Sequence, residues 1–165
     1  MASVVHDDDY DDDGDELLYT SLHKRIYYAV VNGDKKLLAE AIRMIRARED
    51  LPFRKDPEYH NTPLHYAAKY GRTDIVELLL QEGHPINCTE NDGWTALHWA
   101  SNNNKQTTVK KLLDLGADPF IKNKQGRSAR DMTTNPEIKV LILNAEFTRK
   151  SREQPGMRWR IRVTL

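Results

Sequence analysis

The sequence contains a single cysteine, Cys88, among its 165 residues. One thiol excludes an intramolecular disulfide and a cysteine-based zinc cluster, because each of these needs two or more cysteines. A lone thiol also fits a reducing compartment, where disulfides are rare. The cysteine content therefore predicts an intracellular protein, located in the cytoplasm, the nucleus or both.

Long apolar runs are missing as well. The longest uninterrupted run covers residues 26–31, whereas a membrane-spanning helix needs about 20 apolar residues. The first residues lack the positive charge and the apolar stretch of a secretory signal peptide. We therefore expect a soluble protein that has no membrane partner.

The sequence also lacks the motifs of common enzyme, cofactor and metal sites. It has no GxGxxG loop and no Walker loop for a nucleotide. None of its six histidines stands at HxxxH or Cys/His ligand spacing, and the aspartate-rich stretch at 7–15 lacks the alternation of an EF-hand loop. No base for Cys88 is suggested by the sequence. These absences predict a non-enzymatic protein without a cofactor or a bound metal.

The chain as a whole has a formal net charge of zero, but its two ends carry opposite charges. Lysine and arginine together number 25, as do aspartate and glutamate. Residues 1–16 carry eight carboxylates and no lysine or arginine, whereas residues 149–165 carry six basic side chains and one glutamate. Such asymmetry predicts interaction tails, or tails that attract each other. We assign residues 1–18 to an acidic, disordered tail and residues 148–165 to a basic C-terminal tail.

What the sequence does contain is a repeat of 33 residues. The segment TPLHYAAKYGRTDIVELLL begins at Thr62, and TALHWASNNNKQTTVKKLL begins at Thr95. A degenerate third copy starts near Gly126, and a fainter unit precedes the first copy. A catalytic residue has no reason to recur with the period of a scaffold. We therefore predict that the repeated His65 and His98 are structural.

Each copy carries the local signals of two helices. Thr62 is suited to cap a helix start, and Pro63 is suited to its first position, where no N–H is needed. Gly71 suits a left-handed helix end, and Asp74 suits the positive N-terminus of a second helix. Apolar residues from Ile75 onward then follow at helical spacing. The predicted unit is helix, turn, helix and loop.

This pattern resembles the ankyrin repeat. The features in common are the Thr-Pro-Leu-His motif, the alanine pair, the mid-repeat glycine, the paired leucines and the period itself. The resemblance implies an all-α fold, an ankyrin-repeat solenoid of stacked helix-turn-helix units with short hairpin loops, over residues 19–147. The implied units are a divergent N-terminal unit at 20–56, repeats at about 57–89 and 90–122, and a shortened C-terminal cap at 123–147. The repeated histidine would hydrogen-bond to threonine and to backbone at the turn, which ties adjacent repeats together.

The sequence departs from the family pattern at several positions. His60 stands where the turn glycine is usual, and Asn104 replaces the mid-repeat glycine of the second copy. Arg130 and Asp131 break the core motif of the third copy. Polar substitutions are expected in a terminal repeat, because one side of it faces water.

The resemblance also implies a function. Ankyrin proteins bind partner proteins through the concave face and the hairpin tips, so we predict a monomeric adaptor for another protein. Carried over by position, the hairpin candidates for partner binding are Glu58, Tyr59, Asn61, Asn91, Asp92, Trp94, Lys124, Gln125 and Arg127. The inner-helix candidates are Lys69, Tyr70, Asn102 and Asn103. Trp94 would either anchor the partner or fold over its own hairpin, whereas Tyr66 and Trp99 are expected to pack within the stack.

Two other functions stay open on the sequence alone. An acidic arm would suit an escort or chaperone for a basic protein, because it raises encounter rates with a positive surface. Over 158–163, arginines alternate with apolar residues, which suits a short strand, an amphipathic arm or contact with nucleic-acid phosphates. Nucleic acid is the less favoured partner. The partner itself is not specified, because ankyrin surfaces vary over a constant scaffold.

Overall fold

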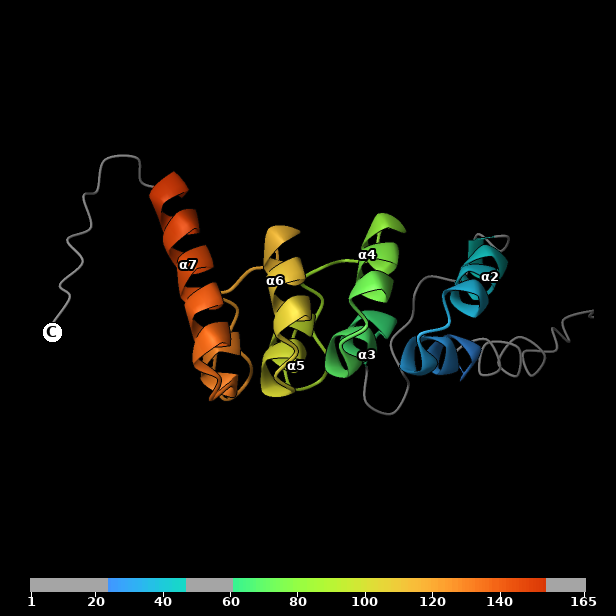
Figure 1. The fold of residues 1–165 in the computed structure, drawn as a ribbon, viewed down its shortest axis with the longest axis horizontal. Helices are drawn as coiled ribbons and strands as arrows, with labels where there is room; N and C mark the ends of the chain where they lie inside the picture. Colours follow the sequence, from blue (N-terminus) through green and yellow to red (C-terminus); the bar gives the residue numbers. More distant parts are fainter. Residues whose placement is uncertain (1–23, 47–60, 154–165) are drawn as a thin grey trace, which may run out of the picture.

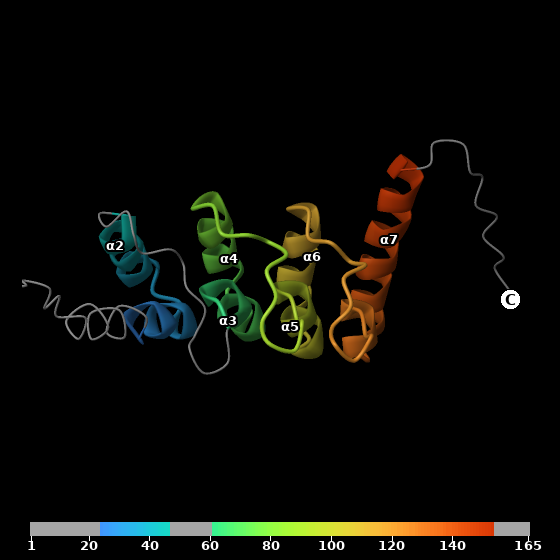
Figure 2. The ribbon, with the colours of Figure 1, turned by 180° about the vertical axis from the view of Figure 1, so that it is seen from behind.

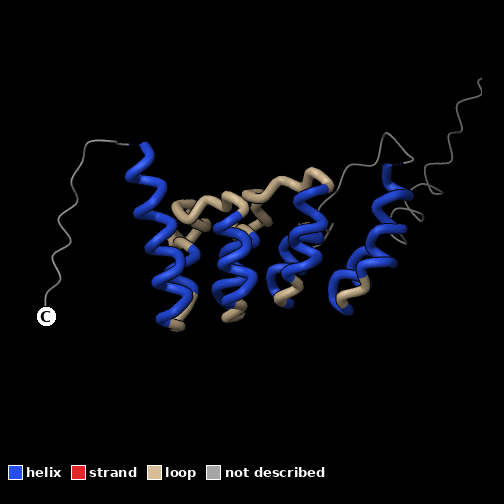
Figure 3. The backbone as a smooth tube through the Cα atoms, turned by 45° about the horizontal axis from the view of Figure 1, so that its top comes forward, coloured by secondary structure: helices blue, strands red, loops and turns tan. Residues whose placement is uncertain are grey.

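The structure, a computed structural model, describes residues 24–46 and 61–153. Within these ranges it consists of helices joined by turns and loops and contains no strand. The helices stand in pairs that follow one another along the long axis of the molecule (Figure 1). The longer loops that connect successive pairs gather along one edge (Figure 3). The predicted all-α repeat solenoid is confirmed.

The helix pairs form two layers. The inner layer consists of a helix at residues 24–32, α3 (Pro63–Tyr70), α5 (Ala96–Asn102) and the 3-10 helix η1 (Ala129–Met132). The outer layer consists of α2 (Lys35–Arg46), α4 (Thr73–Gln81), α6 (Gln106–Asp114) and α7 (Pro136–Glu153). In the inner layer α3 packs on α5 and α5 on η1, and in the outer layer α4 packs on α6 and α6 on α7 (Figure 2). Helix α7 continues past residue 147, where we placed the end of the repeat domain.

The core is continuous from one pair to the next. Leu64 and Leu97, which occupy the same position in α3 and α5, are 0% and 1% exposed. Ala67 and Ala68 are also fully buried, and their small side chains let α3 and α5 approach closely. Each unit therefore depends on its neighbours to bury its apolar faces.

The turn between the helices of a unit requires a left-handed residue. Gly71 has φ 71°, and the N–H groups of Gly71 and Arg72 donate to the Ala68 and Ala67 carbonyls at 3.2 and 2.9 Å. The corresponding Asn104 has φ 54°, a conformation that asparagine tolerates better than most residues. Its Oδ1 accepts a hydrogen bond from the Thr133 hydroxyl at 2.9 Å, which explains the departure from glycine.

Alanine at either of two such glycines should destabilise the fold. We expect Gly71→Ala and Gly83→Ala, at φ 71° and 87°, each to lower the free energy of unfolding by about 1–2 kcal/mol. A Cβ at Gly71 would meet Lys105 Cδ at 2.9 Å, whereas one at Gly83 would meet nothing within 4 Å. Because the Lys105 side chain is flexible and can move aside, the left-handed φ dominates at both positions, and the two variants should show similar losses in urea unfolding. Two variants as stable as the wild type would contradict these turn conformations.

Polar contacts tie the first pair to the second. The Arg72 guanidinium donates to the Val31 carbonyl from Nε at 3.2 Å and from Nη2 at 2.6 Å. Lys35 Nζ lies 3.0 Å from Asp74 Oδ2 and, together with the Ile75 N–H, lowers the pKa of Asp74. Because this ion pair is exposed, it adds little to stability. Asp74 occupies the first turn of α4, as predicted.

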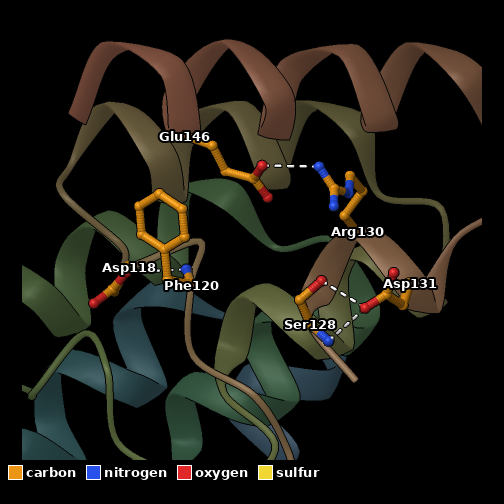
Figure 4. Close-up of polar contacts among 6 residues, drawn as sticks. All are labelled: Asp118, Phe120, Ser128, Arg130, Asp131 and Glu146. Atoms are coloured by element: carbon orange, nitrogen blue, oxygen red, sulfur yellow. Dashed lines mark hydrogen bonds and ion pairs between the residues drawn. The ribbon is translucent and has the colours of Figure 1, made fainter. Parts of the chain in front are cut away.

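The last pair has a different cap. Ser128 donates to Asp131 Oδ2 from its N–H and from its hydroxyl, both at 2.8 Å (Figure 4). These two bonds, the N–H first, lower the pKa of Asp131. Arg130 Nη1 lies 2.8 Å from Glu146 Oε2 and so pairs η1 with α7. The residues that break the repeat motif thus form polar contacts of their own.

Candidate protein-binding surface

A threonine and a histidine fix the start of the inner helices α3 and α5. In α5, the Thr95 N–H donates to His98 Nδ1 at 3.2 Å, and the Thr95 hydroxyl lies 2.8 Å from the same atom. On the other side of the ring, Nε2 lies 3.1 Å from the Arg127 carbonyl in the next unit. A backbone N–H can only donate and a carbonyl can only accept, so the ring is neutral with its proton on Nε2.

The same arrangement recurs in the preceding unit. The Thr62 N–H lies 3.0 Å from His65 Nδ1, and His65 Nε2 lies 3.0 Å from the Cys88 carbonyl. Both imidazoles are 1% exposed. The prediction that His65 and His98 are structural ties between repeats is confirmed.

Buried histidines make stability depend on pH. Burial lowers the pKa of His84 and of His98 below the ordinary value of 6.5, and the hydrogen bond of His98 to the Arg127 carbonyl offsets only part of this effect. The unfolded chain therefore binds protons first as the pH falls. Stability that is present at neutral pH should be lost progressively below about pH 6.5.

We accordingly expect a lower free energy of unfolding at pH 5.5 than at pH 7.5. Urea titrations at fixed ionic strength measure this difference. The lowered pKa values of Asp74 and Asp131 act only near and below pH 4, so this window reports the histidines. Equal or higher stability at pH 5.5 would show that the rings are not held neutral by burial.

Most of the predicted partner-binding residues that the structure describes reach the surface. The exposed ones are Tyr70, Asn91, Asp92, Asn102, Lys124, Gln125 and Arg127, and the half-buried ones are Lys69, Trp94 and Asn103. The expected exposure of Asn61 is wrong: it is 8% exposed, because it directly precedes the capping Thr62 and its side chain is enclosed there. Glu58 and Tyr59 lie outside the described residues. Partner contact by these residues stays a prediction.

Aromatic rings line the inner layer across its first three units. We call Tyr27, Tyr66, Trp99 and Trp94 the aromatic row. The Tyr27 and Tyr66 rings meet edge to face with centroids 4.9 Å apart, and the Trp94 and Trp99 centroids are also 4.9 Å apart. Tyr66 and Trp99 are half-buried against the core, as predicted. Trp94 packs on α5 rather than standing free of the stack.

Lys69 extends over this row. Its Nζ lies 5.1 Å from the Trp99 ring centroid and 5.7 Å from that of Tyr70, so the ammonium rests against aromatic faces. The Asn103 side chain instead turns back and donates to the Trp99 carbonyl at 2.9 Å. Lys69 and Tyr70 therefore offer more to a partner than Asn103 does.

Hydrogen bonds donated by backbone N–H groups hold the hairpin tips in place. The Glu90 carboxylate accepts from the N–H groups of Asp92 and Trp94 at 3.0 and 2.9 Å. The Lys124 N–H donates to the Asp92 carbonyl at 2.9 Å and so joins two successive tips. The backbone of these tips therefore needs little further ordering to bind a partner, which favours affinity.

Two features escaped prediction from the sequence. Tyr28, 58% exposed, adds another ring beside Tyr27. No motif in the sequence marks the surface positions of this helix, because the first unit lacks the Thr-x-Leu-His motif. Cys88 has an imidazole neighbour, since its Sγ lies 3.9 Å from His84 Nδ1 across a short loop.

Residues 24–46 and 61–153 contain neither a candidate membrane span nor a candidate metal cluster. No helix in these ranges has the length and apolar character needed to cross a bilayer. Nor do the histidine, cysteine, aspartate and glutamate side chains of these ranges gather in threes as a metal site would require.

Comparison with known proteins defines the class. A family model of ankyrin repeats in three copies matches residues 26–123, more than half of the chain. The chain belongs to the ankyrin-repeat family. Repeats of this family generally mediate protein–protein interaction, and the fold is typically a non-enzymatic scaffold.

Several larger proteins contain similar repeats. BCL-6 corepressor-like protein 1 of Homo sapiens is 31% identical over 113 residues, which cover 67% of this chain and 6% of that protein. Protein phosphatase 1 regulatory subunit 12A of Mus musculus is 39% identical over 71 residues, which cover 43% of this chain and 7% of that protein. Inversin of Homo sapiens is 31% identical over 127 residues, which cover 75% of this chain and 12% of that protein. The chain thus matches only a small part of each relative.

A solved structure shows the same fold. The ankyrin-repeat domain of Bcl-3 superposes with a TM-score of 0.63 at 23% identity, over 72% of this chain and 50% of that one. This likeness supports the stacked-repeat architecture and carries no information about a partner.

Proposed function

We propose that the chain is an adaptor that binds one partner protein through the inner layer and the hairpin tips. The observation that carries this proposal is the aromatic row, which crosses three units and is flanked by Tyr28 and Tyr70, 58% and 37% exposed. Tyrosine and tryptophan supply large contact areas and dominate binding hot spots. The rings form two contacting pairs, Tyr27 with Tyr66 and Trp94 with Trp99, and Lys69 of α3 reaches over Trp99, so a single partner can contact both pairs.

The charges near this surface favour a protein over a nucleic acid. Lys69, Lys124 and Arg127 are balanced in part by Glu90 and Asp92. A nucleic-acid surface would carry a basic stripe instead. Such mixed charge suits a polar rim around an aromatic centre. The single cysteine supports action inside the cell, in the cytoplasm, the nucleus or both.

A matched pair of variants tests the proposal. Asn102 and Asp114 are exposed last residues of α5 and α6, in the inner and outer layers of one unit. The immobilised full chain, Asn102→Arg and Asp114→Arg would each be incubated with extract of the native cells, and bound proteins quantified by mass spectrometry. A partner bound by the wild type and Asp114→Arg but lost by Asn102→Arg supports the proposal. A partner lost only by Asp114→Arg contradicts it.

The alternative functions depend on segments outside the described residues. An escort for a basic protein would use residues 1–16, and nucleic-acid contact would use the arginines within 158–162. Deleting residues 1–16 separates the escort from the adaptor. Adaptor binding survives this deletion with weak salt dependence, whereas escort binding is lost and is strongly weakened by salt in the intact chain.

A further inference from the structure

Helix α7 is apolar on two opposite sides. Ile138 and Ile142 face the stack and are fully buried. Val140, Leu143 and Phe147 follow one another along a different face and are 53%, 46% and 50% exposed. We call these three residues the α7 stripe. A helix end of a repeat stack normally presents polar residues to water, because no further repeat covers it.

The position of Leu143 in the repeat indicates that another segment covers this face of α7. Leu80 and Leu113 stand 33 residues apart in α4 and α6, and both are half-buried against the core. Leu143 follows Leu113 by 30 residues, which is the same position once the three-residue shortening of the last unit is counted. In the earlier units this leucine borders the unit that follows, since Leu80 shares a surface hollow with Leu115, and Leu113 shares one with Leu141 and Ala145. In the last unit the structure leaves it exposed.

We propose that the α7 stripe is covered by residues 157–165 of the same chain. This segment follows α7, which ends at Glu153, after a connection of only three residues. Pro155 and Gly156 stand between them, a dipeptide that ends helices and reverses the chain. The proposal does not depend on the partner-binding surface, which lies on the inner layer.

The spacing of the segment matches the stripe. Trp159, Ile161 and Val163 alternate with arginines, so an extended segment places all three apolar side chains on one side. Each two-residue step of an extended chain advances about 6.6 Å, and the helix covers this length in about 4 residues. An antiparallel course after the 155–156 turn therefore brings Ile161 to Leu143.

The neighbouring contacts follow from that placement. Trp159 meets Phe147, and Val163 meets Val140, which are the residues on either side of Leu143 in the stripe. The pairing thus covers the whole stripe with the apolar side chains of one short segment.

The charges around the α7 stripe indicate which kind of interaction would hold the segment in place. Lys139 and Lys150 are exposed beside the stripe, and so is Glu137, three residues before Val140. The arginines of the segment point away from the helix and into water in the proposed arrangement. The contact is therefore mainly apolar, with charges of both signs beside it, so added salt should weaken it little.

Cysteine cross-linking in the full chain tests the proposal. On a Cys88→Ser background, the pair Leu143→Cys with Ile161→Cys places two thiols face to face. The control pair is Leu143→Cys with Arg160→Cys, because residue 160 points to the opposite side. We expect an intramolecular disulfide to form at least about 10-fold faster in the first pair, at 50 mM and at 500 mM salt.

Two outcomes would overturn the proposal. Equal rates for the two pairs would show that the segment does not dock in this arrangement. A disulfide between two chains, formed faster at higher protein concentration, would show that a second copy covers the stripe instead.

A second measurement needs no cysteine. In full-length protein labelled for NMR, Trp159→Ser with Ile161→Ser should shift the amide signals around the α7 stripe and leave α3 and α5 unchanged. The matched control is Arg158→Ser with Arg160→Ser, which should leave the stripe signals in place. Unchanged stripe signals in the first variant would contradict the proposal, even if both variants fold.

Discussion

Replacing His98 with alanine is expected to lower the free energy of unfolding by about 3 kcal/mol. The change removes the ring that joins Thr95 to the Arg127 carbonyl of the next unit. It leaves the buried Thr95 N–H without its acceptor and opens a cavity at a residue that is 1% exposed. Because each unit depends on its neighbours, a weakened junction affects the whole stack. Urea unfolding followed by circular dichroism measures the loss.

Two control variants provide a comparison for the expected loss of unfolding free energy in His98→Ala. Asp131→Ala removes a helix cap of the last unit and should cost about 1 kcal/mol, as single caps do. Tyr70→Ala, at an exposed helix end, should change the free energy of unfolding by less than about 0.5 kcal/mol. A loss below about 1 kcal/mol for His98→Ala would mean that the histidine does not join the repeats.

The second large effect concerns binding. Tyr70→Ala is expected to weaken the affinity for the partner by about 10- to 30-fold, since a hot-spot tyrosine contributes about 1.4–2 kcal/mol or more. Its ring is exposed beside Lys69, and Lys69 rests against Trp99. Once the partner has been captured and purified, isothermal titration calorimetry measures both affinities.

Leu115→Ala is the matched control for Tyr70→Ala. Leu115 is also apolar, is 46% exposed, and directly follows α6 in the outer layer. Its replacement should change the affinity by less than about 2-fold, as most residues outside a hot spot do. The reverse ranking of the two variants would place the partner on the outer layer.

The local helix signals accounted for much of the fold because they act at short range. The capping threonines, Gly71 and the apolar spacing of α4 each set a backbone conformation within a few residues. The repeat period then showed which histidines belong to the scaffold. The third copy was harder to predict, since a Ser128–Asp131 pair takes the place of threonine and histidine.

Surface features depended on contacts between units, which the sequence does not specify. Trp94 and Asn61 occupy matching positions 33 residues apart, yet the first packs on Trp99 and the second is enclosed. Tyr28 was missed because its unit lacks the repeat motif. Helix α7 continues to Glu153, beyond the predicted domain end at 147, and the sequence did not indicate this because its last residues are charged and resemble a tail.

Hydrogen–deuterium exchange of the chain with and without its captured partner tests the central claim most directly. The partner should protect amides of the inner helix ends and the tips, around residues 69–71, 91–94, 102–104 and 124–127. Exchange in α4 and α6 should change little, because the outer layer faces away from the proposed contact. Protection confined to α4 and α6, with unchanged exchange at the tips and inner helix ends, would contradict the account.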